Sequence, residues 1–131
     1  MDPGQIKWEG VEAIKPEVLE TFPYEGERQS ITYQTKEFSA VCPWSGLPDF
    51  GTLSVRYVPR RKILELKSFK YYLVSFRNVG IYQEHAANRV LEDLVACAAP
   101  RWMEVELDYS LRGGIHTVVT VAHGDRRNVA R

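Results

Sequence analysis

Several features that would place a chain in a broad class at once are scarce in this sequence. Only two of its 131 residues are cysteine, which excludes a disulfide scaffold and fits a reducing compartment. No apolar run approaches the roughly 20 residues of a membrane span, and residues 1–7 lack the apolar core of a signal peptide. With 17 basic and 17 acidic residues, the chain lacks the net positive charge that general nucleic-acid binding needs. We therefore expect a cytoplasmic protein without membrane or nucleic-acid partners.

The patterns that are present alternate between strand and helix. Residues 1–27 contain three prolines and no sustained period, and we expect an extended N-terminal arm with one helical turn. Residues 28–131 then form a single domain. Within it the patterns predict strands over 29–42, 52–58, 103–109 and 115–122, helices over 69–76 and 82–98, and a short strand over 63–65 that pairs back with 52–58.

The predicted order ββααββ indicates an α+β fold, in which an antiparallel sheet carries both helices on one face. The other face of the sheet needs a cover, and 131 residues leave little chain to supply it. We therefore expect a homo-oligomer.

The stretch over 40–50 places Cys42 and Asp49 on one short, turning loop with Pro43 and Gly46. A free cysteine is most often a small packed hydrophobe, and an aspartate after proline is an ordinary turn residue. A thiol beside a carboxylic acid, however, is what covalent attack on an electrophilic carbon requires. Cys97, in contrast, lies on the apolar stripe of the second predicted helix and is expected to pack.

A zinc site is the alternative use of this thiol. Cys42 would then be joined by His85, His116 or His123. No CxxC or HxxxH spacing supports such a site, and each ligand would come from a separate segment.

Cations cluster at two places where an anion could bind. Lys67 and Lys70 lie near the start of the first helix, where the helix dipole favours acids. They are either solvated or hold a phosphate between themselves and the helix amides. Arg112 precedes Gly113 and Gly114, which form either a plain hairpin turn or a permissive site beside a cation. The sequence has neither a GxGxxG nor a GxxxxGKS/T fingerprint, so a nucleotide would need another cradle.

Glu84 lies at the start of the second helix. It either compensates the helix dipole or accepts two parallel hydrogen bonds from a guanine-like pair of N–H groups. Spacing alone does not choose between these roles.

Together these motifs resemble the 7-cyano-7-deazaguanine reductase (QueF) family in its short, single-module form. The matching segments follow one another in order over nearly the whole chain after residue 19. They are LETF (19–22), EF (37–38), CP (42–43) through Gly46, PDF (48–50), ELKSFKY (65–71), SFRN (75–78), Glu84, Asn88, DL (93–94) and RGGI (112–115).

The resemblance implies a tunnel fold (T-fold) whose subunits form stacked pentameric rings with active sites between subunits. It also implies the reaction, in which the nitrile of 7-cyano-7-deazaguanine is reduced to an aminomethyl group on the route to queuosine in tRNA. The reaction consumes two NADPH and is expected to need no metal.

The resemblance also implies a role for each site residue. Cys42 would add to the nitrile carbon to give a thioimide, and Asp49 would protonate the nitrogen. The substrate would be bound by Leu64, Glu65, Leu66, Gln83 and Glu84, and the NADPH phosphates by Lys67, Lys70 and Arg112. The family often has histidine where this chain has Gln83, whose amide can hydrogen-bond but cannot titrate near neutral pH.

Two other interpretations remain open from the sequence. The first is a different T-fold enzyme acting on a purine or pterin, such as a cyclohydrolase, which would need a metal or other acid–base residues. The second is a purine-binding module without catalysis, in which the loss of Cys42 would not affect binding.

Overall fold

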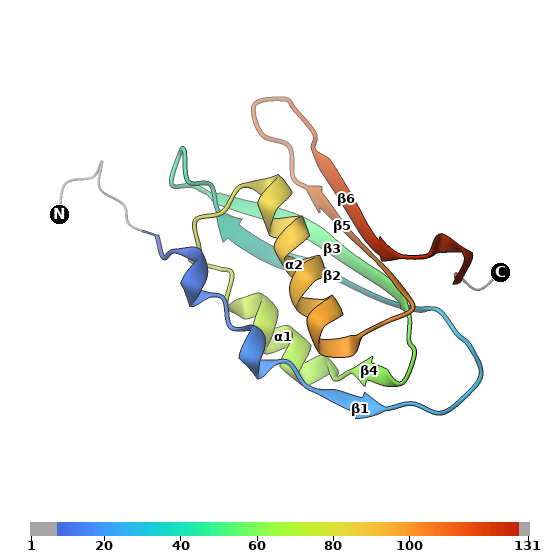
Figure 1. Cartoon of the computed structure of the whole chain (residues 1–131). Coiled ribbons are helices and arrows are strands. Elements are labelled where there is room, and N and C mark those ends of the chain that lie inside the picture. Colours follow the sequence, from blue (N-terminus) through green and yellow to red (C-terminus); the bar gives the residue numbers. More distant parts are fainter. Residues whose placement is uncertain (1–7, 129–131) are drawn as a thin grey trace.

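The computed structural model describes residues 8–128, and they form two layers. Figure 1 shows a four-stranded antiparallel sheet with two helices lying across one of its faces. The sheet has the order β2-β3-β5-β6, and the helices lie in the chain between β3 and β5. The bounds are β2 (Ile31–Val41), β3 (Pro48–Val58), α1 (Leu66–Val74), α2 (Gln83–Ala98), β5 (Trp102–Tyr109) and β6 (Val118–Gly124). The ββααββ order with both helices on one face is therefore confirmed.

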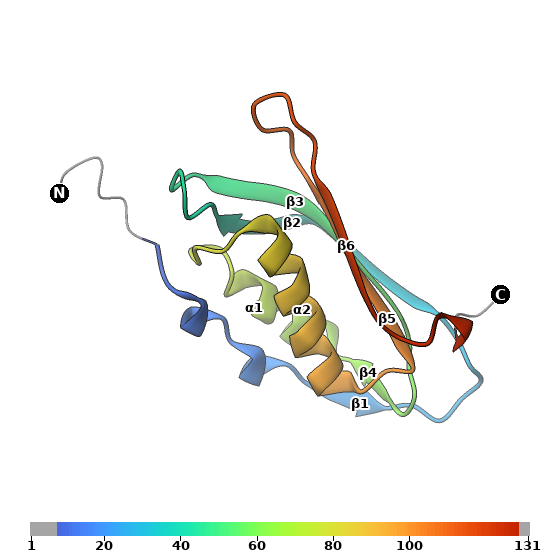
Figure 2. The same cartoon turned by 45° about the horizontal axis from the view of Figure 1, so that its top comes forward.

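The helix-covered face of the sheet carries the core because apolar residues alternate along the central strands. Leu53 of β3 lies opposite Leu107 of β5, and Val55 lies opposite Val105; all four are buried. The helices contribute Tyr72, Val90 and Leu94 to the same cluster. Figure 2 shows these helices in front of the sheet, with its far side open.

That far side is polar, and the expected cover of this face stays a prediction. Ser54 of β3 lies opposite Glu106 of β5, and Arg56 lies opposite Glu104; none of the four is fully buried. An antiparallel sheet can face water on one side, although the Nε atom of Arg56 is buried here without a hydrogen-bond partner.

A second, two-stranded sheet corrects the predicted pairing of the segment over 63–65. The short strand is β4 (Lys62–Leu64), and its partner is β1 (Thr21–Pro23) rather than β3. Pro59 has no N–H for the ladder, and the chain leaves the sheet at this residue. Leu64 is then buried, and its backbone N–H donates to the Tyr57 hydroxyl over 3.0 Å.

The N-terminal segment packs along the helical layer. Single 3-10 turns occur at Val11–Ala13 and Pro16–Val18, the second close to the expected helical turn. Ile14 between them is only 3% exposed and belongs to the core cluster. Among residues 8–128, neither helix is long and apolar enough to cross a bilayer.

We predict that Ile14→Ala lowers the free energy of unfolding by about 2–5 kcal/mol, because it empties a buried site. Val11→Ala is the matched control: Val11 is 45% exposed, and its truncation should change stability by less than about 0.5 kcal/mol. Urea unfolding at one fixed protein concentration measures both. Equal effects of the two variants would show that the segment does not pack as described.

Candidate active site

Backbone hydrogen bonds bring the end of β2 and the start of α2 together. Val41, the last residue of β2, donates to the carbonyl of Val79 over 2.9 Å and accepts from the N–H of Ile81 over 3.0 Å. Cys42 directly follows Val41, and Gln83 and Glu84 come shortly after Ile81. The thiol and the first turn of α2 are therefore neighbours.

A tight hairpin loop fixes Cys42. Its N–H donates to the carbonyl of Leu47 over 2.9 Å, and its carbonyl accepts from the N–H of Gly46 over 2.8 Å. Gly46 has a φ of 72°, a left-handed conformation that glycine adopts without strain. The loop thus turns the thiol back toward the start of β3.

Asp49 is the second residue of β3 and not part of the loop. Strand alternation puts it on the same face as Leu53 and Val55, so it is 3% exposed. A carboxylate at such a position requires a hydrogen-bonded partner.

Arg112 supplies that partner from the turn between β5 and β6. Its guanidinium forms an ion pair with the Asp49 carboxylate and donates a second hydrogen bond to the Ser45 hydroxyl over 3.1 Å. Arg112 and Ile115 exchange both backbone hydrogen bonds, and Gly113 and Gly114 between them have φ of 57° and 78°. A two-residue turn with two positive φ values needs this glycine pair, so the turn serves to aim the arginine.

These elements enclose an open pocket of about 330 Å³. It brings together five of the residues predicted from the sequence: Cys42, Asp49, Gln83, Glu84 and Arg112. Tyr82, Ile115 and Thr117 complete its lining; Ser45, which bonds Arg112, was likewise not identified from the sequence. The spacing of these four residues in the sequence does not identify them as site residues. Tertiary contacts between three separate segments bring them to the pocket.

The pocket favours the ionised form of Cys42. Burial acts to raise the pKa of the thiol, but hydrogen bonds from the side chain and N–H of Ser45, from the N–H of Trp44 and from Arg112 outweigh it and lower the pKa. In Cys97 burial raises the pKa, only partly opposed by Lys62, and the side chain packs against the core. The thiolate is the nucleophilic form of cysteine, so we expect Cys42 to react faster than Cys97.

The start of α1 does not join this pocket. The Glu65 carboxylate accepts from the backbone N–H groups of Lys67 and Ser68 over 2.7 and 2.8 Å, which lowers the pKa of Glu65. The amides that were expected to bind a phosphate are therefore already occupied by this N-cap. Lys67 lines a small hollow with Glu65 and Tyr71, and Lys70 lines another. Leu64 is buried in the core, whereas Leu66 is exposed.

The histidines are not brought to the thiol. His116 contacts Asp108 over 2.6 Å, and His85 packs edge-on against Tyr82. Among residues 8–128, no three ligand side chains gather in a metal-binding group.

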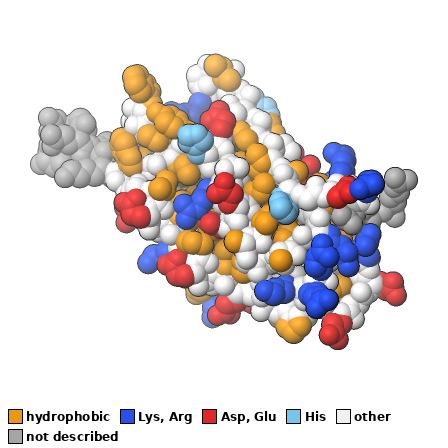
Figure 3. Space-filling model, in the orientation of Figure 1, with side chains coloured by type: hydrophobic (Ala, Val, Ile, Leu, Met, Phe, Trp, Pro, Cys, Tyr) orange, Lys and Arg blue, Asp and Glu red, His pale blue; other side chains and the backbone are white. Residues whose placement is uncertain are grey.

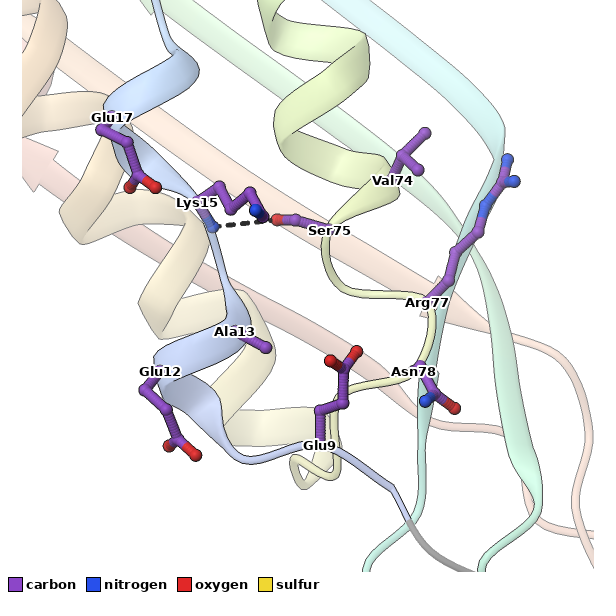
Figure 4. Close-up of a pocket in the computed structure, with 9 residues that line it drawn as sticks. All are labelled: Glu9, Glu12, Ala13, Lys15, Glu17, Val74, Ser75, Arg77 and Asn78. Carbon is purple, nitrogen blue, oxygen red and sulfur yellow. Dashed lines mark hydrogen bonds between the residues drawn. The ribbon is translucent and has the colours of Figure 1, made fainter.

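A second hollow of about 380 Å³ lies between the N-terminal segment and the end of α1 (Figure 4). The side chains of Glu9, Glu12 and Glu17 mix there with Lys15 and Arg77, and the backbone N–H of Lys15 donates to the Ser75 hydroxyl over 3.1 Å. Its lining residues include no thiol, so the Cys42 pocket is the better candidate for a covalent reaction.

Known proteins share this architecture and its sequence. A family model described as QueF-like protein matches residues 48–128, which is more than half of the chain. The chain belongs to the QueF-like protein family. The match begins after Cys42 and includes Asp49, Glu84 and Arg112.

Relatives of this QueF-like chain are similar over most of its length. Proteins from Caldicellulosiruptor bescii and Thermoanaerobacter pseudethanolicus are 53% and 51% identical over 116 residues, which cover 87% of this chain and 88% and 87% of theirs. One from Chlorobium luteolum is 48% identical over 84% of this chain and 97% of its own. All three are named NADPH-dependent 7-cyano-7-deazaguanine reductase.

A solved structure supports the fold. The crystal structure of the archaeosine synthase QueF-Like in the apo form matches with a TM-score of 0.67 and 26% identity, covering 78% of this chain and 98% of that one. The T-fold expected from the sequence is thereby confirmed.

We predict that iodoacetamide at pH 7 modifies Cys42 well before Cys97, because only Cys42 has a lowered thiol pKa. Peptide mass spectrometry after timed quenching gives both rates in one sample. Raising the pH should narrow the difference as Cys97 ionises. Faster modification of Cys97 at pH 7 would contradict the site.

Proposed function

We propose that this chain reduces the nitrile of 7-cyano-7-deazaguanine to an aminomethyl group with NADPH, in the biosynthesis of queuosine. The observation that carries the proposal is the meeting of Cys42, Asp49 and Glu84 in one pocket. The close relatives, about half identical, carry this activity in their names. The family assignment favours this function over a cyclohydrolase or a purine-binding module. A working thiol also fits the reducing cytoplasm.

In the proposed covalent step the Cys42 sulfur bonds to the nitrile carbon as one π bond of the nitrile breaks. The thiol loses one proton and the nitrile nitrogen gains one, so the protons balance. The product is a thioimide. Asp49 lies in the same pocket and can pass this proton on. Because Arg112 pairs with its carboxylate, Asp49 must first receive the proton that it donates.

Glu84 and Gln83 are proposed to orient the ring. The exposed Glu84 carboxylate in the first turn of α2 can accept two parallel N–H bonds from a guanine-like edge. The Gln83 carbonyl accepts from the Tyr109 hydroxyl over 3.3 Å, which fixes its backbone and leaves its side-chain amide for the substrate. The backbone of Leu64, Glu65 and Leu66 is proposed to border the ring from another subunit.

NADPH would supply the hydride that reduces the carbon. Lys67 and Lys70 suit its phosphates, because both are exposed and lie one helical turn apart on α1. With Glu65 occupying the helix amides, their ammonium groups would carry the binding. Since neither lysine lines the Cys42 pocket, we propose that a second copy of the chain brings them to it.

The surface around the pocket supports such an assembly. Large apolar side chains are exposed on the β2–β3 and β5–β6 loops, and Figure 3 shows hydrophobic atoms at these loop tips. They are Trp44, Leu47, Leu111 and Ile115, with Trp44 87% exposed, and Phe50 near the start of β3 is exposed as well. Apolar patches of this kind mark interfaces. We propose a homo-oligomer with the site at the subunit boundary, in the stacked pentamers that the resemblance implies.

We predict a covalent adduct on Cys42 when the chain meets 7-cyano-7-deazaguanine without NADPH. Intact-mass and peptide mass spectrometry should find it on Cys42 in the wild type and in Cys97→Ala, and not in Cys42→Ala. With NADPH, absorbance at the nicotinamide band should fall only when the nitrile is present. Asp49→Asn should slow turnover by about 10²–10⁴-fold.

An adduct on Cys97, or NADPH oxidation that survives Cys42→Ala, would remove the covalent mechanism. Nitrile binding without any oxidation of NADPH would instead favour the binding module.

We predict that Lys67→Ala and Lys70→Ala raise the KM for NADPH more than the KM for the nitrile, because each removes a phosphate-binding charge. If the lysines act across a subunit boundary, mixing inactive Cys42→Ala chains with a Lys67→Ala/Lys70→Ala double variant should restore part of the turnover at low NADPH. The unmixed variants are the controls. If subunit exchange does not restore turnover, Cys42 and the two lysines of one site come from the same chain.

A further inference from the structure

Arg112 contacts the groups of the covalent step directly. The resemblance assigns it to the NADPH phosphates, yet its guanidinium lies in the Cys42 pocket and not beside Lys67 or Lys70. One nitrogen pairs with Asp49 and another donates to Ser45. Ser45 and Arg112 both act to lower the pKa of the Cys42 thiol, so one cation acts on the nucleophile, the acid and the loop that holds them.

The surroundings of Asp49 explain why a cation is required there. Its side chain is 4% exposed, whereas that of Arg112 is 37% exposed. A carboxylate buried without a partner is costly, and a thiolate beside it would be opposed by like charge. The guanidinium offers several donors in a fixed planar fork, so it can bond Asp49 and Ser45 at once and remain hydrated on its outer side.

We propose that Arg112 is a positioning residue of the covalent step, holding the carboxyl group of Asp49 and the sulfur of Cys42 side by side in the free enzyme. The proposal rests on the proposed function only for the identity of the electrophile. The effect of Arg112 on the thiol needs neither substrate nor NADPH.

Other charged groups also face the Cys42 thiol, and they determine whether each substitution raises or lowers the pKa of that thiol. Asp49 on β3 and Glu84 at the start of α2 oppose the thiolate, and Arg112 alone among the pocket-lining residues is a cation. Burial, Asp49 and Glu84 together raise the pKa of Tyr109, which therefore stays neutral. The remaining ionisable neighbour is the Tyr82 phenol.

The decisive experiment measures the alkylation rate of Cys42 against pH in Cys97→Ser chains without substrate or cofactor. Arg112→Gln should slow alkylation at pH 7 by about 3–10-fold and move the rate profile to higher pH, because the thiolate loses its cation. Asp49→Asn should act in the opposite direction and speed alkylation, because it removes the opposing carboxylate. Arg112→Lys keeps the charge without the fork and should lie between the wild type and Arg112→Gln.

Arg77→Gln is the matched control. Arg77 is exposed and lines the hollow of Figure 4 instead of the Cys42 pocket, so its loss should leave the alkylation profile unchanged. Circular dichroism and thermal melting of each variant establish that it is folded. Because general loosening of the pocket would move Arg112→Gln and Asp49→Asn in the same direction, opposite shifts identify an electrostatic effect.

A second measurement separates this role from a cofactor role. The rate of adduct formation with saturating 7-cyano-7-deazaguanine, measured without NADPH, should fall in Arg112→Gln. An unchanged alkylation profile with a raised KM for NADPH would overturn the proposal and assign Arg112 to the cofactor. If the wild type forms no adduct but the alkylation shifts occur, the proposed function fails while the role of Arg112 toward the thiol stands.

Discussion

The paired hydrogen bonds between Val41 and the segment before α2 hold the site together, because they join two elements that are forty residues apart in the chain. β2 ends at Val41 and delivers Cys42, and α2 begins just after Ile81 and delivers Gln83 and Glu84. The β2–β3 hairpin then returns Asp49 to the same place, and β5 closes it through the Tyr109 hydroxyl. Each functional group therefore sits at the end of a rigid element, where its position follows from the ladder or helix behind it.

The electrostatics of the pocket follow from strand alternation. An aspartate two residues into β3 must face the core, and its carboxylate then needs a cation that the core cannot supply. The β5–β6 turn supplies Arg112 from outside, and its two glycines adopt the positive φ values that the turn requires. The same guanidinium lowers the pKa of the thiol against the effect of burial. Asp49 thus shapes the reactivity of Cys42 through its partner as well as through its own charge.

The sequence predicted the fold and the pocket better than the start of α1. Alternation and helical periodicity are local, so the ββααββ order and the packing of Cys97 could be derived from them. The partner of β4 is non-local, and the chain gave no sign that Thr21–Pro23 would displace β3. The use of Glu65 as an N-cap was also missed, although a side chain preceding Lys67 and Ser68 can reach their amides. The β5–β6 hairpin brings Arg112 to Asp49, which lies more than sixty residues earlier in the chain. Residue spacing in the sequence cannot show such a contact.

A single chain presents an open site, and its surface suggests which part a second copy would complete. The sheet face away from the helices is polar, so burying it removes little apolar surface from water. Several of the exposed large apolar side chains instead lie on the two loops that carry Cys42 and Arg112. Burying them would release about 25 cal/mol for each square ångström of apolar surface, and it would exclude water from the thiol at the same time. Under the proposed function, assembly and catalysis would then depend on the same loops, and a change at Trp44 or Leu111 would weaken both.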